Sequence, residues 1–205
     1  MRLLAVNDSL TAIGQPHIDL PLYRDAFCIP VPDFYARLIG RPLSGAEWEL
    51  ADHTYQDAYR RYQHEHTTLM PGAHDALEGW RSAGGTQSLV SLHHHQELVD
   101  ELHQHGIAHY FTKISGRLGP TGGTKSRAMV THIQHLAIPR RNIVAIGDTA
   151  DDALAAQIAG IRVVLYTGGA SSARELADTG APLVDSLTSA LGVAAYWLAP
   201  EPGTC

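Results

Sequence analysis

The chain has 205 residues, 44% of them hydrophobic and 18% charged, which is the composition of an ordinary folded protein with room for one sizeable core. Its net charge of −6 argues against a nucleic-acid-binding protein, which would normally carry a basic face. Two cysteines, Cys28 and Cys205, are too few for a disulfide framework and favour a reducing compartment. The N-terminal apolar run is far shorter than a signal peptide or a membrane span, so we expect a cytoplasmic protein with no membrane partner.

The first part of the chain predicts a strand followed by a small helical region. Residues 2–6 are apolar and uninterrupted, which indicates a short buried strand. Residues 14–71 then change character. Four prolines punctuate the first half, and aromatic residues recur three and four positions apart from Ser44 to about His66. We interpret this region as a helical insert whose helix has an aromatic inner face.

From Pro71 onward, strands and helices alternate. Strands are predicted at 86–92, 111–114, 142–146 and 162–166, and helices after Pro71 and at 96–105, 125–135 and 151–159. Alternation of apolar, β-branched strands with helices is typical of a parallel sheet covered on both faces. We therefore predict an α/β protein: a Rossmann-like parallel core of residues 1–13 and 72–205, with an inserted helical cap of residues 14–71.

Two carboxylates stand where one of these strands turns into a helix. Asp148 and Asp152 are four residues apart, which places both at the start of the helix and beyond the end of the strand. Carboxylate oxygens there suit Mg²⁺. The alternative is helix capping, which needs only one such residue. We favour the metal site, because Asp151 adds a third carboxylate to the same turn and like charges repel.

Two further polar residues are expected at the same edge of the sheet, where ligands bind in folds of this kind. Ser91 follows an apolar strand, and its hydroxyl could bind a phosphate oxygen. Lys125 begins a predicted helix and could pair with a phosphate or with the neighbouring carboxylates. Each signal is weak alone, and their order along the chain gives them weight. We expect Lys125 to lie within salt-bridge reach of Asp148 or Asp152.

In this order the residues resemble the haloacid dehalogenase-like superfamily of phosphatases, in the branch with a helical cap after the first strand. Ser91 matches the second motif of that family, Lys125 the third, and Asp148 with Asp152 the fourth. The chain is most similar to phosphoglycolate-phosphatase-like members. The resemblance implies a Mg²⁺-dependent phosphatase acting on a small phosphorylated molecule.

The first motif of the family is Asp-x-Asp-Gly-Thr at the end of the first strand, and this chain departs from it. Aligned without gaps, Asn7 takes the place of the nucleophile and Ser9 that of the general acid/base. An amide is a very poor nucleophile, and a serine hydroxyl does not transfer protons well near neutral pH. A second register makes Asp8 the nucleophile, but then places Leu10 at the acid position. The strand ends at Asn7, Ser91 and Asp148 are expected to meet.

Two hypotheses follow for the function. One is a phosphatase-like protein with a degenerate catalytic site: weak or inactive in hydrolysis, with weak or absent Mg²⁺ binding, and holding a phosphorylated small molecule or a protein partner. The other is an active Mg²⁺-dependent phosphomonoesterase that uses Asp8. The sequence does not indicate an oligomeric state.

A run of three histidines, His93, His94 and His95, follows Ser91 directly. Imidazole suits Zn²⁺, Ni²⁺ or Cu²⁺. Because the side chains of adjacent residues diverge, we interpret the run as a turn rather than as a metal site.

Overall fold

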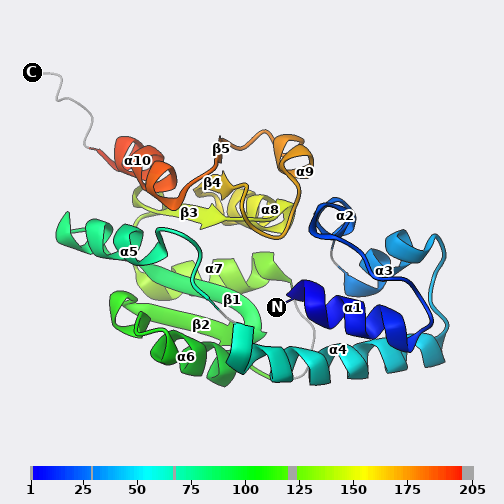
Figure 1. Ribbon diagram of the computed structural model, residues 1–205. Helices are drawn as coiled ribbons and strands as arrows, with labels where there is room; N and C mark the ends of the chain where they lie inside the picture. The colour runs from blue at the N-terminus through cyan, green and yellow to red at the C-terminus, as the bar shows by residue number, and fades with distance from the viewer. Residues whose placement is uncertain (1, 29, 67, 120–123, 200–205) are drawn as a thin grey trace, which may run out of the picture. The chain divides into compact units, whose positions relative to one another are not determined.

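The computed structural model describes residues 2–28, 30–66, 68–119 and 124–199, so Cys205 lies outside the described residues. The chain divides into two compact units (Figure 1). Unit 1 comprises Met1–Thr68 with Ala170–Arg174, and unit 2 comprises Leu69–Gly169 with Glu175–Cys205. No helix in the described part of the chain is both long and apolar enough to cross a membrane.

Unit 1 is built from helices: α1 (Arg2–Ala12), α2 (Leu20–Ala26), α3 (Val31–Ile39) and α4 (Gly45–His66). Its core gathers aromatic and aliphatic side chains, with Phe34 and Tyr35 fully buried at its centre. Trp48 and Tyr55 of α4 pack against this core, which confirms the aromatic inner face predicted for that helix. Cys28 also packs against it.

The predicted strand at residues 2–6 is wrong, because this segment is the first part of helix α1. A five-residue apolar run fits a strand or a buried helix equally well. The helical period continues beyond the run: Val6 and Leu10 are buried one turn apart, and α1 packs along α4. Residues 1–13 therefore belong to helical unit 1, and their assignment to the parallel core is wrong.

Unit 2 contains every strand of the described chain, each alternating with helices. The strands are β1 (Ser88–His94), β2 (Lys113–Arg117), β3 (Val144–Gly147), β4 (Arg162–Tyr166) and β5 (Leu183–Val184). Its α-helices are α5 (Ala73–Ser82), α6 (His95–Gln104), α7 (Lys125–Leu136), α8 (Ala150–Ala159) and α10 (Leu187–Leu198). Helix α9 (Ala173–Ala177) has residues in both units. Short 3-10 turns span Ala108–Tyr110 and Arg140–Asn142.

All strand pairs are parallel, which confirms the predicted α/β class. The described strands form two sheets instead of the single expected one. β1 pairs with β2, and β3, β4 and β5 pair in that order. One apolar cluster fills the space between α7, α8 and the second sheet, and a second cluster lies under α6.

Helix α7 is attached to the first sheet by a buried histidine. The ring of His132, which is only 4% exposed, lies 2.7 Å from the Ser115 hydroxyl and 2.8 Å from the Ser88 hydroxyl. Ser88 belongs to β1 and Ser115 to β2, so one side chain ties α7 to both strands. Burial, together with the positive charges of Lys113 and His135, lowers the pKa of His132.

Candidate functional site

The candidate site lies beside the middle of β1 and the carboxyl end of β3 in unit 2, where Lys125 joins the two sheets. The Lys125 ammonium is 3.1 Å from Asp152 Oδ1 and donates to the Val90 carbonyl at 3.3 Å. Val90 lies in β1, and Asp152 lies in the helix that follows β3. The Thr124 hydroxyl caps the helix that Lys125 begins. The expected salt bridge between Lys125 and the aspartate pair is confirmed.

Asp152 is held by the start of α8 as well as by Lys125. Its Oδ2 accepts hydrogen bonds from the Asp148 amide, the Thr149 amide and the Thr149 hydroxyl, at 2.8 to 3.1 Å. The Thr149 hydroxyl accepts from the Asp152 amide in return, which completes a capping box. The capping role that the sequence analysis set aside is therefore present. Both carboxylate oxygens of Asp152 already have partners.

The carboxylates of Asp148 and Asp151 take no part in the capping box. Gly169 passes directly over Asp148: a Cβ atom at Gly169 would lie 2.2 Å from Asp148 Oδ2. Only glycine fits at that position without movement. Among the described residues, no group of three acidic, histidine or cysteine side chains is arranged to hold a metal ion. One carboxylate still fits Mg²⁺, which keeps several waters and is commonly bound by one or two carboxylates together with substrate phosphate.

Asp151 also belongs to the site, although its position in the sequence predicted no separate role for it. Burial raises the pKa of its carboxyl, the charge of Asp152 raises it further, and Lys125 partly offsets both effects. The sequence shows only that three aspartates share the turn. It does not show which of them is partly desolvated, because that depends on packing.

We predict that Asp151→Asn will raise the free energy of unfolding at pH 7. Because the folded pKa is raised, ionisation of Asp151 costs stability as the pH rises through that pKa. This gain in the free energy of unfolding should shrink as the pH falls toward the ordinary pKa of 3.8, because the carboxyl then becomes protonated in the folded and in the unfolded protein. Denaturant unfolding at pH 7 and pH 4 provides the measurement. Asp178→Asn, at an exposed position of unit 2, is the control and should show no such difference. An equal effect of Asp151→Asn at both pH values would contradict the prediction.

Ser91 is the middle residue of β1, so the strand-end position expected for it is wrong; the strand continues to His94. Its hydroxyl oxygen accepts a hydrogen bond from the His93 amide at 3.0 Å. This local turn uses one acceptor position of the hydroxyl and leaves its proton available for a ligand oxygen.

Two of the three histidines, His93 and His95, have different partners, as expected for side chains that diverge. The ring of His93 faces Glu97 and Glu101 of α6, at 3.7 and 3.4 Å. His95 begins α6 and accepts from the Gly116 amide at 3.2 Å.

The strand end expected at Asn7, Asp8 and Ser9 is wrong, because these residues lie within helix α1 of unit 1. Their catalytic assignment stays a prediction. Asn7 exchanges two hydrogen bonds with the backbone of Ile18, at 2.9 and 3.1 Å. Its amide therefore serves as a clamp for the following loop.

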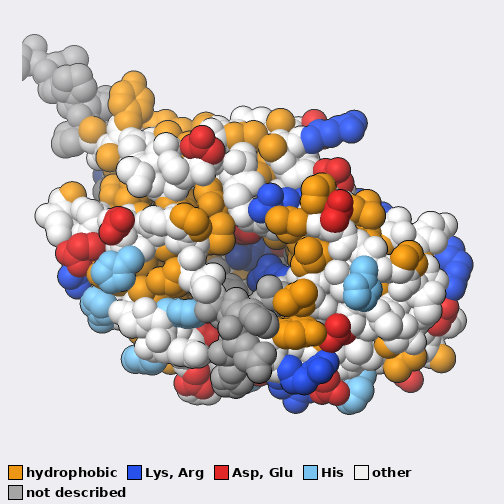
Figure 2. Space-filling model, in the orientation of Figure 1, with side chains coloured by type: hydrophobic (Ala, Val, Ile, Leu, Met, Phe, Trp, Pro, Cys, Tyr) orange, Lys and Arg blue, Asp and Glu red, His pale blue; other side chains and the backbone are white. Residues whose placement is uncertain are grey.

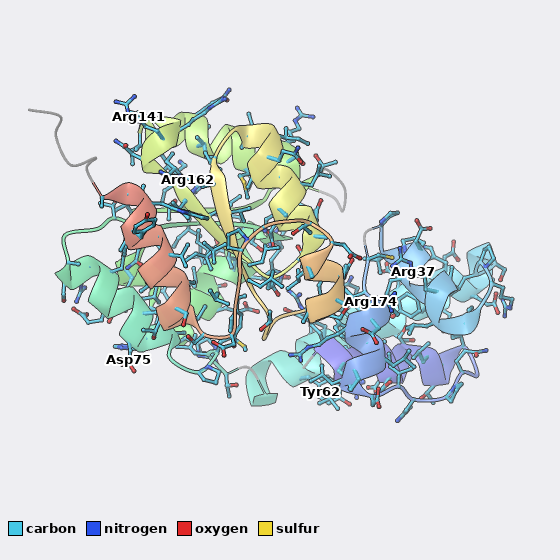
Figure 3. The ribbon with its side chains drawn as sticks, turned by 90° about the horizontal axis from the view of Figure 1, so that it is seen from above. Arg37, Tyr62, Asp75, Arg141, Arg162 and Arg174 are labelled. Carbon is cyan, nitrogen blue, oxygen red and sulfur yellow. The ribbon has the colours of Figure 1, made fainter. Side chains whose placement is uncertain are left out.

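Ser9 and Asp8 likewise have structural partners in unit 1. Ser9 is fully buried; its hydroxyl donates to the Ala51 carbonyl at 2.8 Å and accepts from the Tyr35 hydroxyl at 2.9 Å. Asp8 accepts hydrogen bonds from the Arg61 guanidinium at 3.1 Å and from the Tyr62 hydroxyl at 3.0 Å. Both partners lie on α4, where Tyr62 is labelled in Figure 3. These contacts account for all three side chains without catalysis.

Basic side chains also lie outside the candidate site. On the face in Figure 2, basic and acidic side chains of the described residues are interspersed. At the start of β4, Arg162 donates to the Arg141 carbonyl at 2.9 Å and lies 5.5 Å from the centre of the Trp197 ring (Figure 3). That guanidinium already has a carbonyl and an aromatic ring as partners.

Known proteins resemble this chain over most of its length. The model of the haloacid dehalogenase-like hydrolase family matches residues 30–166. A phosphoglycolate phosphatase of Vibrio vulnificus (strain CMCP6) is 30% identical over 202 residues, which is 93% of this chain and 87% of the relative. A phosphoglycolate phosphatase of Vibrio parahaemolyticus is 26% identical over 204 residues, covering 94% of this chain and 88% of the relative.

Solved structures show the same fold at lower identity. A haloacid dehalogenase-like hydrolase family protein of Streptococcus pneumoniae has a TM-score of 0.78 at 21% identity, covering 92% of this chain and 88% of that one. A predicted phosphoglycolate phosphatase of Haemophilus somnus 129pt has a TM-score of 0.72 at 18% identity, covering 94% of this chain and 90% of that one.

Proposed function

Because the chain belongs to the haloacid dehalogenase-like hydrolase family, we propose that unit 2 binds the phosphate group of a small phosphorylated molecule beside the middle of β1 and the carboxyl end of β3. The observation that carries this proposal is the position of Lys125, whose ammonium lies between β1 and the start of α8 and is held there by Asp152 and the Val90 carbonyl. The hydroxyl of Ser91, the residue that follows Val90 in β1, is a second donor for a phosphate oxygen.

Each side chain has a separate role in this proposal. Lys125 supplies a point charge to the phosphate. Asp152 positions that ammonium and the start of α8, and is not itself a ligand, because both of its oxygens have partners. Asp148 is the carboxylate that would hold Mg²⁺. When bound, Mg²⁺ would supply positive charge to the phosphate oxygens.

The charges at the site make phosphate binding depend on the cation. Asp148, Asp151 and Asp152 place three carboxylates beside one ammonium, an arrangement that repels an anion. A divalent cation reverses this balance. Phosphate and Mg²⁺ should therefore bind weakly when alone and more tightly together.

Hydrolysis by the described residues should be weak or absent. The carboxylates at the site are the three aspartates of the β3–α8 turn, and the structure places Asn7, Asp8 and Ser9 in a helix of unit 1. A phosphatase that lacks a positioned nucleophile loses several powers of ten in rate. The names of the relatives suggest phosphoglycolate as the first ligand to test.

Calorimetric titration with phosphoglycolate in the presence of Mg²⁺ tests the proposal. We expect Lys125→Met to weaken binding by about 10- to 100-fold, since a hydrogen bond between charged groups is lost. Lys113→Met is the matched control. Lys113 is the first residue of β2 and so lies at the amino end of that strand. The affinity of this variant for phosphoglycolate should equal that of the unmodified protein. Equal affinity in the two variants would contradict the proposed site. Mg²⁺-dependent turnover at rates typical of enzymes would contradict the expected lack of hydrolysis.

A further inference from the structure

Two glycines allow the aspartates of the β3–α8 turn to pack closely against the backbone. A Cβ atom at Gly147 would lie 2.4 Å from the Cβ atom of Asp152, and a Cβ atom at Gly169 would lie 2.2 Å from that of Asp148. Both glycines lie outside the left-handed region of φ, so their backbone conformation does not require glycine. Each is required because the side chain of an aspartate fills the space that a Cβ atom would take.

Gly169 lies in a loop that is attached to the second sheet. The loop begins at Thr167, directly after β4, where the Thr167 amide donates to the Val184 carbonyl at 2.9 Å. The Thr167 hydroxyl donates to the same carbonyl at 3.3 Å. Val184 belongs to β5. Gly169 is thus two residues from an anchored strand end, and its backbone is held against the Asp148 side chain.

Asp148 is held from its own main chain by the capping box. Its amide donates to Asp152 Oδ2 at 3.1 Å, and Asp152 Oδ1 lies 3.1 Å from the Lys125 ammonium. The main chain of Asp148 therefore cannot move away from Gly169 without disturbing the start of α8. Rotation about the Cα–Cβ bond of Asp148 moves its oxygens but leaves its Cβ atom in place. Such rotation would not relieve the contact with a larger residue at position 169.

We infer that Gly169 is a positioning residue for the cation: its backbone, which carries no side chain, fixes the Asp148 carboxylate in the orientation that binds Mg²⁺. This inference rests on the proposed function, in which Asp148 holds the cation. A methyl group at position 169 forces the two Cβ atoms apart by about 1 Å or more before they reach ordinary carbon–carbon contact. Mg²⁺ binds oxygen at about 2.1 Å in a nearly ideal octahedron, so a displacement of that size removes the carboxylate from its place as a ligand.

Gly169→Ala tests the inference, with Mn²⁺ as the probe. Mn²⁺ takes the same carboxylate and water ligands as Mg²⁺, and the electron paramagnetic resonance signal of the free ion is lost on binding. We expect Gly169→Ala to weaken Mn²⁺ binding by about 10- to 100-fold, as changes to residues that orient a metal ligand do.

Gly168→Ala is the matched control. It adds the same methyl group one residue earlier in the loop, where the nearest atoms belong to the end of the Tyr166 side chain. Because the end of a flexible side chain can move aside, the Mn²⁺ affinity of this variant should equal that of the unmodified protein. Equal Mn²⁺ affinity in Gly169→Ala and in the unmodified protein would overturn the inference.

A double variant separates positioning of the carboxylate from general damage to the fold. In the Asp148→Asn background the charged ligand is already lost, so Gly169→Ala should cause no further loss of Mn²⁺ binding. A further loss of the same size as in the unmodified background would assign Gly169 a purely structural role and overturn the inference.

Hydrogen exchange in the unmodified protein supplies a measurement that needs no variant to fold. Because the loop lies against the carboxylate that would hold the cation, Mg²⁺ should slow amide exchange at residues 167–169. Unchanged exchange there, under conditions in which Mg²⁺ binds, would overturn the inference alone. Failure of the unmodified protein to bind either ion would contradict the proposed function and this inference with it.

Discussion

Ser9→Asp should destabilise unit 1 rather than supply a catalytic acid. Ser9 is fully buried, and its hydroxyl donates to the Ala51 carbonyl and accepts from Tyr35. A carboxylate at this position cannot donate to the Ala51 carbonyl, and neither of the two groups that contact the Ser9 hydroxyl is a cation. We expect the free energy of unfolding to fall by about 3 kcal/mol or more.

Denaturant unfolding followed by circular dichroism provides the measurement. Ser9→Ala should cost less, about 1 to 2 kcal/mol, because it removes the hydrogen bonds without burying a charge. Ala12→Asp, exposed at the end of the same helix, controls for an acidic residue in α1 and should have a small effect. If Ser9→Asp keeps its stability and gains Mg²⁺-dependent phosphatase activity, the catalytic reading of this segment must be restored.

His132→Ala should have the second large effect, through loss of the link between α7 and the first sheet. The substitution leaves a cavity and deprives the Ser88 and Ser115 hydroxyls of their partner. We expect a loss of about 3 kcal/mol in the free energy of unfolding. Melting of the purified variant against the unmodified protein measures it.

The pH dependence distinguishes this role from simple packing. The pKa of His132 is lowered by burial, so the folded state favours the neutral ring. Its contribution to stability is therefore complete above the ordinary value of 6.5 and falls as the pH drops from there toward the lowered pKa. His132→Ala should lose this pH dependence, whereas His135→Ala, which removes an exposed ring on the same helix, should largely keep it. An identical pH profile in the unmodified protein and in His132→Ala would contradict the assignment.

The alternating half of the chain could be predicted from sequence because its signals are local. Strand 162–166 was predicted with the observed bounds, the three predicted strands before it were displaced by about two residues, and the short strand β5 was not predicted. The Lys125–Asp152 ion pair also followed from position, since both residues begin helices at the carboxyl ends of parallel strands.

The remaining features depend on long-range packing. Residues 2–6 form a helix because the face that includes Val6 and Leu10 packs against α4, which lies more than 30 residues away in the chain. The same contact places Ser9 against Ala51. The partial burial of Asp151 also depends on how helices cover the sheets, which residue periodicity does not encode.

A crystal structure with bound tungstate, in the presence of Mg²⁺, tests the central claim most directly. Tungstate mimics phosphate, and its anomalous signal identifies it without ambiguity. We predict a peak within hydrogen-bond distance of the Lys125 ammonium and the Ser91 hydroxyl, beside the middle of β1 and the carboxyl end of β3. A peak elsewhere on the molecule, with this site empty, would contradict the account.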